Sequence, residues 1–230
     1  SALGDTNLAS WVAGRTAPLN VYGPEGVARV VDGFNEAYAL DRTYRTMHHG
    51  SKLLPPDVGP MRPKLIALGE VTEVGEFSIT PFSVDHDPVQ PAVGYRFEYR
   101  GRSVVVSGDT NALQSTATAS RDADLLLHDA LSRPLVHAMR DAVTSAGNTR
   151  MTRILDDILD YHAHTDSLPE IAREAGVTML ALYHLVPVPP NGIAESIFRR
   201  GLPAEVRLVD DGTVFNLPAN TDAIEVVQIF

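Results

Sequence analysis

Ser103-Val-Val-Val-Ser-Gly-Asp-Thr110 is the stretch of sequence that decides the fold. Three consecutive valines predict a buried strand, and Gly-Asp-Thr ends that strand in a turn. Val93 to Tyr99, separated from it by Arg100-Gly101-Arg102, predicts the partner strand of a β-hairpin. Asp109 is therefore expected where a buried strand leaves its sheet, a position that often carries binding or catalytic side chains in layered α/β folds.

Three histidines repeat this pattern at the ends of other predicted strands. These are Phe77 to Val84 with His86, Asp124 to Leu127 with His128, and Val177 to Tyr183 with His184. Strand ends on one side of a sheet converge on one pocket, so residues far apart in the sequence can meet there. One such histidine alone is more often structural than a ligand. Four polar residues at four strand ends indicate a single site.

Short apolar strands alternate with helical segments along all 230 residues, which favours one α/β domain spanning residues 1–230. The longest predicted helix runs from about Pro134 to Tyr161. Arg207 to Val209 and Val214 to Leu217 are expected to close the chain as a hairpin.

The composition restricts the ligands and partners of the protein. Because the sequence has no cysteine, a metal must be held by His, Asp or Glu, which suits zinc, iron or manganese. A net charge of −10 argues against a nucleic-acid partner. No apolar run reaches the roughly 18 residues of a membrane span, so we expect a soluble protein of the cytoplasm or periplasm.

The ordered set of motifs resembles the metallo-β-lactamase-fold hydrolases of the ribonuclease Z-like and arylsulfatase-like branch. The resemblance covers Pro18 to about Pro187 and implies an αββα sandwich. The segments that carry it are Leu19 to Gly26, His86 before Gly94 to Phe97, Ser107 to Thr110, Leu126 to Ala130, His162 with Ala172 to Val177, and Leu182 to Pro187.

The resemblance implies two divalent metal ions, most simply zinc, with iron or manganese as alternatives. His86 resembles a ligand of the first metal, Asp109 the carboxylate that bridges both, and His184 a ligand of the second. His162 stands 22 positions before His184 and resembles the histidine that protonates the leaving oxygen. His164 is its rival for that catalytic role.

Two further interpretations concern the surroundings of His162. Asp129 is expected to orient a histidine of the site, as carboxylates commonly do around metals. A solvent-facing strand end explains Asp129 equally well. The string from His162 to Asp166 also permits a local metal clip, which is less favoured because it lies outside the family's order of motifs.

The family's His-x-His-x-Asp-His motif is absent from the sequence. Relatives carry it just upstream of a segment like Ala2 to Arg15, so we expect an N-terminally incomplete domain, about the C-terminal two-thirds. Either the chain is part of a longer enzyme, or it is a degenerate form without metal. The persistence of Asp109, His162 and His184 favours the first. We expect this chain alone to be inactive or nearly so. Its uncovered sheet edge predicts either poor solubility or pairing with another chain's edge, for which a homodimer is one form.

The expected activity is hydrolysis of a small-molecule sulfate ester, phosphodiester or lactone through a metal-bridging hydroxide. Ribonuclease Z enzymes carry a long tRNA-gripping arm where this sequence has only the tight connection Glu98 to Arg102, which argues against precursor tRNA as the substrate. The alternatives are a ribonuclease Z-like nuclease and a non-catalytic binding module of the same fold.

Overall fold

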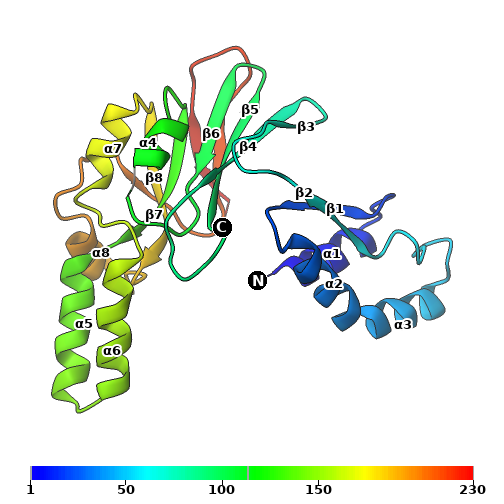
Figure 1. The fold of residues 1–230 in the computed structure, drawn as a ribbon, viewed down its shortest axis with the longest axis horizontal. Helices are drawn as coiled ribbons and strands as arrows, with labels where there is room; N and C mark the ends of the chain where they lie inside the picture. Colours follow the sequence, from blue (N-terminus) through cyan, green and yellow to red (C-terminus); the bar gives the residue numbers. More distant parts are fainter. Residues whose placement is uncertain (1, 113, 230) are drawn as a thin grey trace. The chain divides into compact units, whose positions relative to one another are not determined.

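A computed structural model describes residues 2–112 and 114–229 and divides the chain into two compact units, Ser1–Ala67 and Leu68–Phe230 (Figure 1). The first unit contains α1 (Leu3–Val12), β1 (Leu19–Gly23), α2 (Val27–Ala37), α3 (Ala39–His49) and β2 (Met61–Leu65). β1 and β2 pair in parallel. Trp11 is buried against Leu54 and Val58 and forms the centre of a small core.

The second unit is built on a seven-stranded sheet in the order β3-β4-β5-β6-β7-β8-β9. Its strands are β3 (Thr72–Val74), β4 (Phe77–Ser83), β5 (Val93–Tyr99), β6 (Arg102–Val106), β7 (Leu125–Leu131), β8 (Met179–Val186) and β9 (Arg207–Leu208). The pairs from β3 to β6 are antiparallel and those from β6 to β9 are parallel. The predicted hairpin is therefore confirmed as β5–β6, and the α/β class is confirmed with it.

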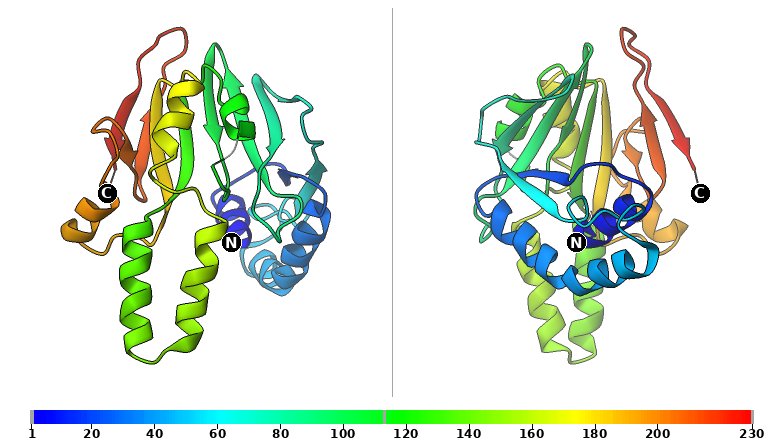
Figure 2. Two further views of the ribbon diagram at one scale, coloured as in Figure 1. Left: turned by 60° about the vertical axis from the view of Figure 1, so that its left-hand side comes forward. Right: turned by 90° about the vertical axis from the view of Figure 1, so that its right-hand side faces the viewer.

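Helices α4 (Gln114–Ala119) and α7 (Leu168–Glu174) lie against one face of this sheet (Figures 1 and 2). The core beneath them is apolar and continues to α8 (Gly192–Phe198). Its fully buried members include Leu126 and Leu182 from neighbouring strands, with Leu168 from α7 and Phe198 from α8. This packing fixes the parallel strands whose ends carry the polar residues.

The prediction of one long helix from Pro134 to Tyr161 is wrong. The segment forms a two-helix hairpin of α5 (Arg133–Ser145) and α6 (Thr149–Asp157), followed by the 3₁₀ turn η1 (Ile158–Asp160). The hairpin extends beyond the end of the sheet (Figure 2). Gly147 adopts φ +73° between the helices, and the Asn148 side chain accepts a hydrogen bond from the Met151 N–H at the start of α6. A left-handed glycine followed by an N-cap asparagine ends one helix and begins the next.

The predicted C-terminal hairpin is also wrong. β9 joins the large sheet in parallel with β8, and β10 (Thr213–Asn216) pairs antiparallel with β11 (Glu225–Gln228). β11 was not expected from the sequence. None of the described helices is long and apolar enough to cross a membrane. The single domain over residues 1–230 stays a prediction.

Candidate metal centre

The loop that carries His86 is pinned to the turn that carries Asp109. The hydroxyl of the fully buried Thr110 accepts a hydrogen bond from the Asp85 N–H at 3.1 Å and lies 3.2 Å from the Asp85 carbonyl oxygen. The Asn111 N–H donates to the same carbonyl at 3.0 Å. These contacts link the end of β4 to the end of β6, so His86 and Asp109 enter the same space.

The backbone at Gly108 sets the direction of Asp109. Gly108 has φ +71°, and a Cβ atom there would lie 2.7 Å from the Val93 carbonyl oxygen. Only glycine fits both the left-handed conformation and this close approach. The Ser107 hydroxyl accepts a hydrogen bond from the Asp129 N–H at 3.2 Å. The turn is thereby joined to β7.

A β-bulge in β8 presents His184. In the parallel pairing with β7, Asp129 faces Tyr183 and Ala130 faces Leu185, so His184 is the extra residue. His184 has φ +44°, which is strained for a residue with a side chain and costs on the order of 1 kcal/mol. Bulges of this kind redirect a side chain next to a functional site.

His86, from the loop after β4, and His184, from β8, both approach Asp109. Their Nε2 atoms lie 3.9 Å and 3.7 Å from Oδ2 of Asp109. Nδ1 of His86 lies 3.0 Å from the Tyr161 carbonyl oxygen, and donation to this oxygen leaves the Nε2 lone pair directed into the cluster. Metal-binding histidines are usually oriented by such a hydrogen bond from the other ring nitrogen.

The donor set fits zinc in its chemistry but does not by itself complete a metal site. Two imidazoles and one carboxylate are zinc ligands, whereas two metal ions need more donors than three. In the described part of the chain, no group of three or more His, Cys, Asp or Glu side chains is arranged to hold a metal ion. His86, Asp109 and His184 therefore do not form a complete metal site by themselves.

His162 and Asp129 form a buried pair beside these three residues. Nδ1 of His162 lies 2.8 Å from Oδ2 of Asp129, and the His162 ring centroid lies 5.4 Å from those of His86 and His184. Asp129 is fully buried, so the solvent-facing alternative is wrong. Burial acts to raise the pKa of Asp129, but the hydrogen bonds from His128 and His162 outweigh it and hold that pKa below its ordinary value.

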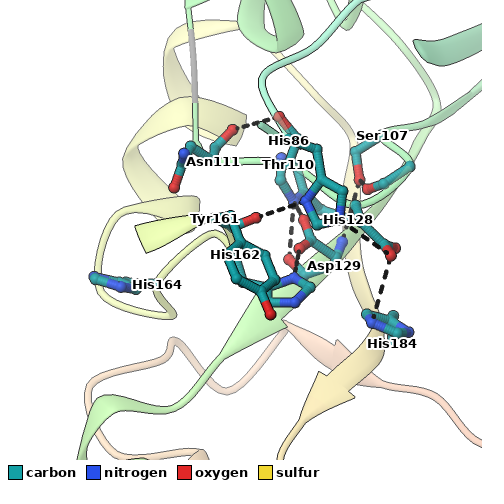
Figure 3. Close-up of polar contacts among 12 residues, drawn as sticks. His86, Ser107, Thr110, Asn111, His128, Asp129, Tyr161, His162, His164 and His184 are labelled. Carbon is teal, nitrogen blue, oxygen red and sulfur yellow. Dashed lines mark hydrogen bonds and ion pairs between the residues drawn. The ribbon is translucent and has the colours of Figure 1, made fainter. Parts of the chain in front are cut away.

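His164 is not brought into the cluster, which corrects its expected catalytic role. Its Nε2 lies 2.9 Å from the Leu159 carbonyl oxygen, and Figure 3 shows it apart from His162. Asp166 pairs with Arg133 at 3.1 Å, so the local metal clip has no support either. Both side chains are occupied by contacts that the sequence does not reveal.

Two residues of the site received no role in the sequence analysis. His128 is fully buried, and its Nδ1 lies 2.9 Å from both the backbone oxygen and Oδ1 of Asp129. Tyr183 contacts Ser107 and the Gly108 backbone, and burial raises the pKa of its hydroxyl to about 12. His128 was expected at a strand end, but it lies within β7, which continues to Leu131. Its position directly before Asp129, and that of Tyr183 directly before His184, were the available signals.

Comparison with known proteins identifies the family of the chain. Residues 6–185 match the family described as the beta-lactamase superfamily domain. The chain belongs to the metallo-β-lactamase superfamily. The expected family and its mixed α/β fold are therefore confirmed.

Similar members of the superfamily are named ribonuclease Z. One from Mycolicibacterium gilvum is 36% identical over 188 residues, which cover 80% of this chain and 61% of the relative. A putative ribonuclease Z from Mycobacterium tuberculosis is 34% identical, with 80% and 78% covered. These names conflict with the expectation that nucleic acid is not a partner, and they give no support to an arylsulfatase.

Solved structures of the superfamily share the fold at low sequence identity. The metallo-beta-lactamase fold protein YhfI from Bacillus subtilis aligns with TM-score 0.56 and 17% identity over 90% of this chain and 69% of that chain. The short form of human tRNase Z aligns with TM-score 0.53 and 16% identity over 91% and 71%.

Proposed function

We propose that this chain contributes to a metal-dependent hydrolase that cleaves phosphodiester bonds. The observation that carries the proposal is the placement of His162, which is fixed by Asp129 on one side and lies beside both His86 and His184 on the other. A proton-transferring imidazole next to metal-type donors is an arrangement that can hydrolyse a phosphodiester.

Each residue has a distinct proposed role. His86, Asp109 and His184 would hold two divalent ions together with further donors, and these ions would supply Lewis-acid chemistry at the ester. Asp129 accepts the Nδ1–H of His162 and thereby fixes the ring orientation. The free Nε2 can then carry a proton to the leaving oxygen, and the carboxylate stabilises the cationic ring before that transfer.

The substrate class that the relatives suggest is RNA, since their names are ribonuclease Z. Because the chain spans only 61% of the first of these relatives, RNA cleavage is a proposal for the whole protein. The net charge of −10 does not exclude it, since a basic surface can be local.

A small-molecule ester is the second candidate substrate, and a cavity beside His184 favours it. The cavity measures about 750 Å³ and is lined by Leu185, Val188 and Val209 together with Asp210 and Asp211. This volume suits a small organic molecule. Two carboxylates at its edge repel the successive phosphates of a polynucleotide.

Hydrolysis assays on the zinc-loaded full-length protein test the proposal. A precursor tRNA transcript, bis-p-nitrophenyl phosphate, p-nitrophenyl sulfate and a lactone would be compared, each with a chelator control. We expect zinc-dependent cleavage of at least one phosphodiester and none of the sulfate. Cleavage of the sulfate or the lactone alone would overturn the proposal, as would activity that survives removal of metal. The ratio of the two phosphodiester rates decides between RNA and a small ester.

A further inference from the structure

His128 is a fully buried polar residue that the proposed reaction does not use. It lies on β7 directly before Asp129 and pairs in register with the buried Leu182 of β8. Its Nε2 has no hydrogen-bond partner among the described residues. A buried unpaired nitrogen costs on the order of 1–3 kcal/mol, so an apolar side chain would suit this position better if packing were its only purpose.

The other ring nitrogen of His128 explains what the residue does. Nδ1 lies 2.9 Å from the backbone oxygen of Asp129, toward which its N–H is directed, and also 2.9 Å from Oδ1. Oδ1 has no hydrogen-bond partner among the described residues, so its 2.9 Å approach to Nδ1 of His128 is an electrostatic contact rather than a hydrogen bond. The Nδ1–H of His128 thus donates to the backbone oxygen of Asp129 and lies beside the carboxylate of the same residue.

The two oxygens of Asp129 therefore face two different imidazoles. Oδ2 receives the hydrogen bond from His162 at 2.8 Å, whereas Oδ1 is held near His128. Rotation of the carboxylate would move Oδ1 away from the Nδ1–H of His128 and Oδ2 away from His162. Because Asp129 and His128 are both fully buried, water cannot replace either contact.

We propose that His128 is a positioning residue that fixes the Asp129 carboxylate in the orientation that His162 requires. This inference rests on the proposed function, in which His162 transfers the proton. His128 does not contact the substrate in this account, and it acts only through Asp129. Loss of the donor would let the carboxylate rotate, and His162 would lose its fixed ring orientation.

Two variants separate the donor of His128 from its bulk. His128→Phe keeps a flat ring without a donor, and His128→Asn places an amide N–H near the position of Nδ1. In ¹H–¹⁵N NMR spectra of the 230-residue chain, we expect the downfield Nδ1–H resonance of His162 to be lost in His128→Phe and retained in His128→Asn. Leu182→Ala is the matched control, because it disturbs the same buried region and should leave the resonance in place.

The zinc-loaded full-length protein gives a second measurement. We expect kcat for the phosphodiester that it cleaves to fall on the order of 10-fold to 100-fold in His128→Phe with zinc content unchanged, and most of the rate to return in His128→Asn. An unchanged His162 resonance in folded His128→Phe would overturn the inference, as would a folded His128→Asn that behaves like His128→Phe. If the wild type cleaves no phosphodiester, the proposed function fails, while the NMR comparison still tests the contact.

Discussion

Nδ1 of His162 lies 2.8 Å from Oδ2 of Asp129, although 33 positions separate the two residues in the sequence. The α5–α6 hairpin and η1 occupy most of the intervening segment, so the chain leaves the sheet after Leu131 and returns to the site at Tyr161. The Tyr161 carbonyl oxygen then accepts from His86. The segment at Tyr161 and His162 thus orients His86 and also supplies His162, the proposed proton donor.

Acid should destabilise the protein through Asp129. Its pKa is lowered in the folded state because the hydrogen bonds from His128 and His162 outweigh burial. A carboxylate whose pKa is lowered in the folded state stabilises the protein at pH values above its pKa in the unfolded chain, about 4. This stabilisation is lost as the pH falls through the pKa of the folded state. Urea unfolding between pH 3 and 7 should therefore show a free energy of unfolding that falls at low pH. Asp129→Asn should make the free energy of unfolding depend less on pH, whereas the exposed Asp166→Asn should not. If the two variants showed the same pH dependence, Asp129 would not be its source.

His162 and His164 offer a matched comparison of two nearby histidines. His162→Ala should lower kcat on the order of 10²-fold to 10⁴-fold with zinc retained, because it removes the proposed proton donor. His164→Ala removes only a contact with the Leu159 carbonyl oxygen and should change kcat less than about 10-fold. Steady-state kinetics with zinc analysis check both. Loss of zinc in His162→Ala would make it a ligand, and equal losses of rate would contradict the assignment.

Gly108→Ala should destabilise the fold more than Gly147→Ala. Both glycines have a left-handed φ, +71° and +73°, so an alanine is strained at either position. At Gly147 the added Cβ meets no atom within 4 Å, whereas at Gly108 it would lie 2.7 Å from the Val93 carbonyl oxygen. We expect a loss of about 1 kcal/mol at Gly147 and about 1–3 kcal/mol more at Gly108 by urea unfolding. Equal losses would show that the turn before Asp109 has room to relax.

The left-handed backbone at His184 should make two substitutions there differ in stability. His184→Gly should be more stable than His184→Ala by about 1 kcal/mol, because only glycine adopts φ +44° without strain. Thermal and urea unfolding of the two metal-free variants measure the difference. If the alanine variant were equally stable, the left-handed backbone would not persist in solution.

The sequence was sufficient to predict the strands that position the site. Valine-rich and leucine-rich runs ending in polar residues indicated β6 and β7, and the order of motifs indicated the family. The break between α5 and α6 was missed although Gly147 and Asn148 are a helix-end and N-cap signal, because helical character continues on both sides of them. β11 was missed because Glu225 to Gln228 is short and all four of its residues are exposed, so it buries no apolar face.

The side-chain contacts of the site depend on tertiary structure that the sequence does not encode locally. From the sequence alone, Asp129 could equally face solvent. In the structure, β8 and the turn at Ser107 lie beside it and bury it. His162 and His164 differ only in which carbonyl or carboxylate lies near each ring. The bulge at His184 is visible only in the register between β7 and β8.

Anomalous X-ray scattering at the zinc edge, from crystals of the zinc-loaded full-length protein, tests the central claim most directly. We expect zinc at coordination distance, about 2.0–2.2 Å, from Nε2 of His86, from the Asp109 carboxylate and from Nε2 of His184. An active protein whose zinc lies elsewhere, with these three side chains free of metal, would contradict it.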